Sequence, residues 1–209
     1  MTKRTYIYPA GKIIIFAKEP VAGRVKTRLA REIGDEAALR IHQKMVIDTV
    51  EMVSQSALAK LELHVSGDLQ HPLFQSIAEQ KGIQVYLQQG SNLGERMFSA
   101  INESLDNASY SVLIGTDCPV MSADYIEQAF GALVQGQDVI IGPAEDGGYV
   151  LIGASRIEAS WFNNIDWGSQ RVLEQTRQAL ISSAARFLEL QPLWDIDHIG
   201  DLNRWRLCQ

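Results

Sequence analysis

Four basic side chains follow the first apolar run of the chain within a short distance. The run occupies residues 13–16 (IIIF), and the cations after it are Lys18, Arg24, Lys26 and Arg28. Glu19 is the only acidic residue among them, although the whole chain carries a formal charge of −6. Lysine and arginine form strong, charge-assisted hydrogen bonds with phosphate oxygens. This stretch can therefore bind a polyanion such as a diphosphate.

The sequence around these cations predicts a loop that leads into a short helix. Pro20 and Gly23 are typical of a loop, and residues 27–34 (TRLAREIG) have a helical pattern. A helix N-terminus adds unpaired amides and a partial positive charge, which favour an anion. Val25 stands where a Walker loop requires glycine, and no G-x-G-x-x-G pattern follows a strand. The stretch is either a phosphate-binding loop of another type or a solvated basic loop.

Two carboxylates follow further apolar runs. Asp117 comes after residues 112–115 (VLIG), and Asp146 comes after residues 139–142 (VIIG). Carboxylate oxygens are good ligands for hard divalent cations. Asp117 has no lysine or arginine close to it in sequence, so we expect a bound cation as its partner. The alternatives are a turn-capping role for Asp117 and an Asp-Gly hairpin turn at Asp146. Together with the basic loop, the two acids predict a metal-bridged diphosphate site.

Two other side chains could carry chemistry. Cys118 has no histidine near it in sequence, so we interpret it as a buried structural thiol rather than a nucleophile. The four histidines show no metal-ligand spacing. Trp167 precedes a helical pattern, and it either packs in the core or lines an acceptor pocket, with the core favoured.

The elements that position these residues follow from the apolar pattern. Short, unalternating β-branched runs are typical of strands buried on both faces of a parallel sheet. We expect neighbouring central strands at 12–17, 111–116 and 138–142, and flanking strands at 61–65 and 83–87. Helical patterns cover 35–57, 93–105, 122–133 and 169–180, with Ser122 and Ser169 as candidate N-caps. This alternation predicts one domain over residues 1–209, a three-layer α/β sandwich with a mostly parallel mixed sheet.

Composition excludes several classes of protein. The chain has 209 residues, and its pI near 5.2 argues against nucleic-acid or anionic-membrane binding. Its two cysteines exclude a disulfide framework. The N-terminal sequence lacks the apolar core of a signal peptide, and no run is long enough to span a membrane. We therefore expect a cytoplasmic protein.

Six motifs occur in an order found in one known family. They are FAKEPVAGRVKTRLA, NLGERM, GTDCPVM, EDGGYVLIG, WGSQRVLEQT and WDIDHIGDLNRW. With these motifs the chain resembles the radical-SAM/selenodomain-associated transferase family over nearly its whole length. That family is a branch of the GT-A nucleotide-diphospho-sugar transferases and is related to 2-phospholactate guanylyltransferase. The resemblance implies a GT-A, Rossmann-like fold that binds a nucleotide through its N-terminal half.

The resemblance also implies roles for individual residues. Gly94 and Arg96 would lie near the base or the ribose. Asp117 would match the metal-binding Asp-x-Asp of sugar transferases and hold Mg²⁺ or Mn²⁺, although only one of the two acids is present here. Asp146 would face the donor or the acceptor, so that Asp117 and Asp146 are the catalytic acids. The phosphate loop would consist of Lys18, Gly23, Arg24, Lys26 and Arg28.

Three functions are compatible with these features. The favoured one is a glycosyltransferase that uses a nucleotide-diphospho-sugar donor and a small-molecule acceptor, with a cation that stabilises the departing nucleoside diphosphate. The second is a nucleotidyltransferase, similar to a guanylyltransferase, that acts on a phosphorylated small molecule and releases pyrophosphate. The third is a nucleotide-binding protein without catalytic activity. This alternative remains because the second acid of the Asp-x-Asp motif is missing.

Overall fold

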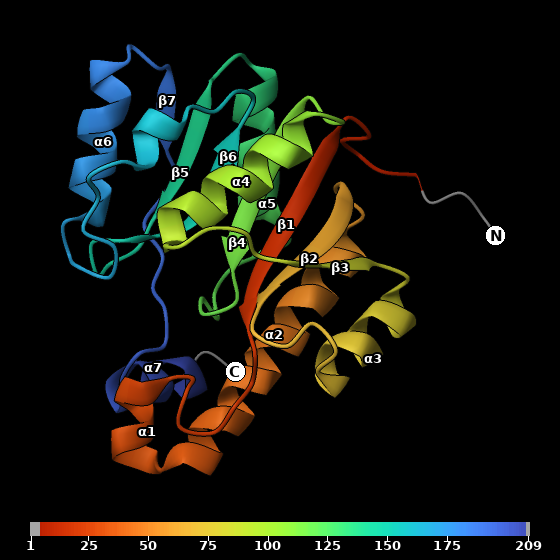
Figure 1. The fold of residues 1–209 in the computed structure, drawn as a ribbon, viewed down its shortest axis with the longest axis vertical. Helices are drawn as coiled ribbons and strands as arrows, with labels where there is room; N and C mark the ends of the chain where they lie inside the picture. The colour runs from red at the N-terminus through yellow and green to blue at the C-terminus, as the bar shows by residue number, and fades with distance from the viewer. Residues whose placement is uncertain (1–4, 208–209) are drawn as a thin grey trace.

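A single seven-stranded sheet forms the centre of the molecule (Figure 1). The computed structural model describes residues 5–207. The strand order is β3-β2-β1-β4-β6-β5-β7, and β6 runs antiparallel to both of its neighbours. The strands are β1 (Gly11–Lys18), β2 (Lys60–Ser66), β3 (Gln84–Leu87), β4 (Tyr110–Gly115), β5 (Val139–Pro143), β6 (Tyr149–Ala154) and β7 (Phe187–Glu189).

Helices cover both faces of this sheet because its central strands are apolar on both sides. On β1, Ile13 and Ile15 pack with α2, α3 and α5, whereas Ile14 and Phe16 pack with α4, α6 and a 3-10 helix, η1. The predicted three-layer α/β sandwich with a mostly parallel mixed sheet is confirmed. The helices are α1 (Thr27–Ile33), α2 (Asp35–Ser56), α3 (Pro72–Lys81), α4 (Leu93–Leu105), α5 (Ala123–Val134), η1 (Ala159–Phe162), α6 (Val172–Ser182) and α7 (Ile199–Leu207).

The prediction that β1, β4 and β5 are immediate neighbours is wrong for β5. Strand β4 pairs with β1 on one side and with β6 on the other, and β5 lies beyond β6. The cause is a tight hairpin between β5 and β6, which returns the chain between β4 and β5. As β6 is antiparallel, its first residue, Tyr149, lies at the edge where β4 and β5 end.

Of the two serines predicted to be helix N-caps, one caps its helix and the other does not. Ser122 is the N-cap of α5, and its hydroxyl accepts a hydrogen bond from the Tyr125 amide at 3.2 Å. Ser169 does not cap α6, because that helix begins at Val172 after Arg171. Instead, the Ser169 hydroxyl accepts from the Arg171 amide inside the preceding turn. Among residues 5–207, no helix is long and apolar enough to cross a membrane.

A segment after β7, which we call the C-terminal strap (residues 190–198), leads from the sheet to helix α7. Figure 1 shows α7 lying beside α1, far from the sheet edge that β7 occupies. The two helices are joined by a small core of buried side chains, which consists of Leu29, Met45, Trp194, Ile196 and Leu202. The strap therefore passes the carboxyl ends of β1 and β4, where ligands bind in open α/β sheets.

Candidate active site

Two adjoining cavities lie at the carboxyl ends of β1 and β4. The first has a volume of about 470 Å³ and the second about 360 Å³. Lys18, His42 and Asp117 line both of them, so the two cavities form one continuous site. The basic loop after β1 surrounds the second cavity, as its position in the sequence predicted.

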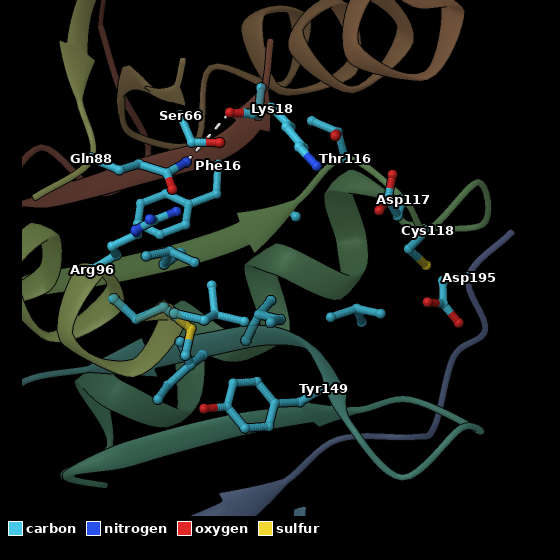
Figure 2. Close-up of a pocket in the computed structure, with 18 of the residues that line it drawn as sticks. Phe16, Lys18, Ser66, Gln88, Arg96, Thr116, Asp117, Cys118, Tyr149 and Asp195 are labelled. Atoms are coloured by element: carbon cyan, nitrogen blue, oxygen red, sulfur yellow. Dashed lines mark hydrogen bonds between the residues drawn. The ribbon is translucent and has the colours of Figure 1, made fainter. Parts of the chain in front are cut away.

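The first cavity has polar ends and an apolar floor (Figure 2). At one end, the Gln88 amide nitrogen donates to the carbonyl oxygens of His64 and Ala17, at 3.0 and 3.4 Å. Arg96 lies at the same end, where its Nε donates to the Gly90 carbonyl at 3.1 Å. Asp117 and Asp195 lie at the other end. The floor between them consists of Leu93, Met97, Leu113, Val150, Leu151 and Ile152.

The basic loop is held in shape by its own backbone and by helix α2. The Lys18 ammonium donates to the Arg24 carbonyl at 2.6 Å, and Gly23 has a positive φ of 73° in the turn between them. The buried His42 Nε2 lies 2.9 Å from the Lys18 carbonyl, so this nitrogen carries the proton and donates. Burial lowers the pKa of His42 and keeps its ring neutral. Arg24 remains exposed, and its guanidinium has no partner within residues 5–207.

Asp117 has a basic partner after all. Its Oδ1 lies 2.9 Å from the ammonium of Lys26, which also donates to the Ile196 carbonyl at 2.6 Å. No lysine or arginine is close to Asp117 in sequence, but one is close in space, because the sheet brings the loops after β1 and β4 to the same edge. The Lys26 side chain is 3% exposed and the Asp117 side chain is 51% exposed. Lys26 therefore links the basic loop to Asp117 and to the C-terminal strap.

The strap contributes two acids, Asp195 and Asp197, that are not among the predicted site residues. Asp195, Asp197 and the predicted Asp146 each place a carboxylate oxygen within 4.8 Å of the others. Burial, and then the charges of Asp146 and Asp197, raise the pKa of Asp195 to about 6. Asp197 also accepts from Arg28 at 2.6 Å. A divalent cation could bind here, because three carboxylates within this distance can share one ion.

Asp146 lies in the turn of the β5–β6 hairpin, which was the alternative interpretation of this motif. Its carboxylate accepts from the Gly148 amide at 2.9 Å, as in an Asx turn. Gly147, with φ of 90°, faces the backbone of Gln170, and a Cβ atom there would lie 2.2 Å from the Gln170 carbonyl oxygen. Gly147 therefore allows the hairpin turn to pack closely against the backbone of Gln170.

Gly94 packs under Trp167, whereas the resemblance implied a position near the base or the ribose. A Cβ atom on Gly94 would lie 2.5 Å from Cζ2 of the indole. Trp167 stacks on Phe162 and lies edge-on to Tyr149, which lines the first cavity. Trp167 is partly buried and packs against the core on the α4 face. This packing fixes the first turn of α4 and, with it, Arg96.

Replacing Gly94 with alanine is expected to lower the free energy of unfolding by about 1–3 kcal/mol, because the added methyl group must displace the indole. Denaturant unfolding measures the change. Gly131→Ala is the matched control, since a Cβ on this helical glycine of α5 meets no atom within 4 Å. That variant should gain about 0.5–1 kcal/mol. A Gly94→Ala protein as stable as the control would contradict the packing of Trp167 on α4.

Some residues of the site were not predicted, although the sequence contains features that indicate them. Asp195 and Asp197 flank the buried Ile196, and in an extended chain this alternation places both carboxylates on one side. His42 lies one turn from both Ala38 and Met45 on the buried stripe of α2. Gln88 directly follows β3 at the carboxyl edge. Cys118 was interpreted correctly, since it is buried and burial raises the pKa of its thiol to about 11.

Residues 49–169 match a family described as "Uncharacterized protein conserved in bacteria (DUF2064)". The chain belongs to this family. The matched segment includes α4, Asp117 and Asp146, whereas the basic loop and the strap lie outside it. No curated protein matches the chain.

Solved structures share the fold of this DUF2064 protein. A "putative nucleotide-diphospho-sugar transferase" from Desulfovibrio desulfuricans G20 is 31% identical, with a TM-score of 0.85 over 93% of this chain and 85% of that chain. A nucleotidyl transferase from Methanothermobacter is 13% identical, with a TM-score of 0.63 over 95% and 96% of the two chains. The inositol-1-phosphate CTP transferase from T. maritima is 12% identical, with a TM-score of 0.60 over 94% of each. The fold is therefore that of the nucleotidyl- and sugar-transferase superfamily.

Proposed function

We propose that this DUF2064 protein is a glycosyltransferase that takes a sugar from a nucleotide-diphospho-sugar and transfers it to a small-molecule acceptor. The observation that carries the proposal is the joining of the two cavities, one lined by the basic loop and the other by an apolar floor between polar ends. The name of the 31% identical structure and the motifs shared with the radical-SAM/selenodomain-associated transferases support the same activity.

The two cavities divide the donor between them. The diphosphate binds in the second cavity, where Arg24 offers an unpaired guanidinium and where Lys18 and Arg28 are further lining residues. The nucleoside binds in the first cavity, where the apolar floor packs against the base and Gln88 and Arg96 offer hydrogen bonds. The Gln88 amide oxygen accepts no hydrogen bond from residues 5–207, which leaves it available to a donor group of the base. The sugar then lies near Asp117 and Asp195.

The resemblance implies a divalent cation, and the residues that fit one are Asp146, Asp195 and Asp197. Three carboxylates with oxygens within 4.8 Å of one another provide the oxygen ligands that Mg²⁺ and Mn²⁺ require. When bound there, the ion supplies positive charge that stabilises the departing diphosphate. Asp195 is half-buried among acids, so its carboxylate also holds a proton more readily than a free aspartate does.

A second candidate is nucleotidyl transfer to a phosphorylated acceptor with release of pyrophosphate. The loop has four cations, which exceeds what the two negative charges of a diphosphate sugar require and suits a nucleoside triphosphate. Nucleotidyltransferases among the structures of similar fold make this activity worth testing.

One experiment separates the candidates. A panel of nucleoside triphosphates and nucleotide-sugars is first screened by thermal shift with and without Mg²⁺ or Mn²⁺, since a ligand at 100 times its Kd stabilises by about 2.7 kcal/mol. Each compound that binds is then incubated with the protein, and the released product is identified by chromatography. Release of a nucleoside diphosphate supports glycosyl transfer, and release of pyrophosphate supports nucleotidyl transfer. Absence of binding across the panel would overturn both.

Replacing Arg24 with alanine is expected to weaken donor binding by about 10- to 100-fold, which corresponds to one charge-assisted contact. Because Arg24 has no partner within the described residues, the free energy of unfolding should stay unchanged. Calorimetric titration with the best ligand of the panel measures the affinity. Arg31→Ala is the control, since Arg31 is exposed on helix α1, which directly follows the loop, and it lines neither cavity. If the two variants bound the ligand with equal affinity, the loop would be a solvated basic loop and not a phosphate-binding loop.

A further inference from the structure

Lys26 occupies the position at Asp117 where the resemblance implies a divalent cation. Its ammonium lies 2.9 Å from Asp117 Oδ1 and 2.6 Å from the Ile196 carbonyl oxygen. The side chain is 3% exposed, and a lysine buried to this extent stays charged only when acceptors surround it. Asp117 and Ile196 are those acceptors.

A metal ion on Asp117 does not fit this arrangement. Oδ1 already accepts from Lys26, and an ion on the other oxygen would lie close to a buried ammonium group of the same sign. The Asp-x-Asp motif is also incomplete here, since Cys118 follows Asp117 and is buried. Asp117 therefore lacks the second acid of the motif and is already paired with the cation of Lys26, and neither feature suits a metal site.

We propose that Lys26 supplies at Asp117 the positive charge that a divalent cation supplies at this carboxylate in metal-dependent sugar transferases. The inference rests on the proposed function, because it concerns the diphosphate of the donor. Lys26 and Asp117 both line the second cavity, so the ammonium acts next to the phosphates without leaving its carboxylate. A divalent cation that assists the reaction then binds to Asp146, Asp195 and Asp197 and not to Asp117.

Lys26 also acts as a positioning residue. Its hydrogen bond to Ile196 and the bond from the Ile196 amide to the Asp117 carbonyl, at 3.0 Å, tie the strap to both loops. The backbone at Lys26 is left-handed, with φ of 47° and ψ of 43°, which is uncommon for a residue other than glycine. From this backbone position the ammonium contacts both the loop after β4, at Asp117, and the strap, at Ile196.

The test compares metal binding and diphosphate binding in four variants. Lys26→Met removes the charge and retains the length of the side chain, and Asp117→Asn removes the carboxylate. Lys26→Met combined with Asp117→Asn removes both, and Arg24→Met is the control that removes an unpaired cation from the same loop. Electron paramagnetic resonance counts bound Mn²⁺, with and without inorganic pyrophosphate. Calorimetry measures pyrophosphate affinity in chelator-treated buffer and again with Mg²⁺.

We expect the wild type and Asp117→Asn to bind the same number of Mn²⁺ ions. Lys26→Met should bind one ion more in the presence of pyrophosphate, and the double variant should lose that ion again. Without metal, Lys26→Met should bind pyrophosphate at least about tenfold more weakly than the wild type, and Mg²⁺ should restore most of the loss. Arg24→Met should bind pyrophosphate weakly both without metal and with Mg²⁺. Its substitution frees no carboxylate that could bind a Mg²⁺ ion in place of the lost charge.

Two results would overturn the inference. One is a Mn²⁺ ion that the wild type binds and Asp117→Asn loses. The other is a folded Lys26→Met protein that gains no ion and is not restored by Mg²⁺. A failure of the proposed function looks different, since no variant would then bind pyrophosphate in either buffer. In that case the comparison of Mn²⁺ binding by the wild type and Asp117→Asn still decides the role of Asp117.

Discussion

Replacing Asp117 with alanine is expected to lower the free energy of unfolding by about 3 kcal/mol, whereas Lys26→Met should lower it by only about 1 kcal/mol. The asymmetry follows from burial, because the lysine is 3% exposed and the aspartate is 51% exposed. Removing Asp117 leaves a buried ammonium with the Ile196 carbonyl as its remaining partner. Removing Lys26 leaves a half-exposed carboxylate that water can solvate, and methionine fills most of the space.

Urea denaturation of the three proteins at neutral pH measures this difference. Asp48→Ala is the matched control, since Asp48 pairs with Lys44 at 2.8 Å on the exposed face of α2. An exposed pair of this kind contributes less than about 0.5 kcal/mol. If Asp117→Ala were no more destabilising than Asp48→Ala, the buried pair would not form in solution.

The parts of the fold that depend on local sequence could be predicted. The run at 13–16 has no polar face, so it had to be buried on both sides, and the loop after it had to reach the carboxyl edge of the sheet. The same reasoning placed Asp117, because it directly follows the run at 112–115. These predictions needed only the type and order of neighbouring residues.

The parts that depend on strand order could not be predicted in this way. The runs before Asp146 and after Gly148 fit either a parallel strand or one arm of a hairpin, and only the Asp-Gly turn favoured the hairpin. The Lys26–Asp117 pair joins two loops that are distant in sequence, so the sequence near Asp117 contains no sign of its partner. Asp195 belongs to the strap, whose path depends on the docking of α7 against α1.

The position of the strap determines the last prediction, which concerns the acids most suited to hold a cation. Asp195→Asn keeps the size of the side chain and removes one of three carboxylates whose oxygens lie within 4.8 Å of one another. If Mg²⁺ binds there, turnover of the donor should fall by at least about 100-fold, because the ion supplies several kcal/mol of charge stabilisation in the transition state. The folded protein should become slightly more stable, by up to about 1 kcal/mol, because the variant removes repulsion between like charges.

The opposite directions of these two effects make the prediction specific, since a variant that merely disturbs the fold would lose stability and turnover together. Steady-state turnover with Mg²⁺ and urea denaturation measure the two quantities. Asp106→Asn is the control, because Asp106 is exposed and precedes β4, at the edge of the sheet opposite to the site. It should leave turnover unchanged. An Asp195→Asn protein that keeps its Mg²⁺-dependent turnover would show that the strap does not hold the cation, and the role of Asp195 would then be limited to the shape of the cavity that it lines.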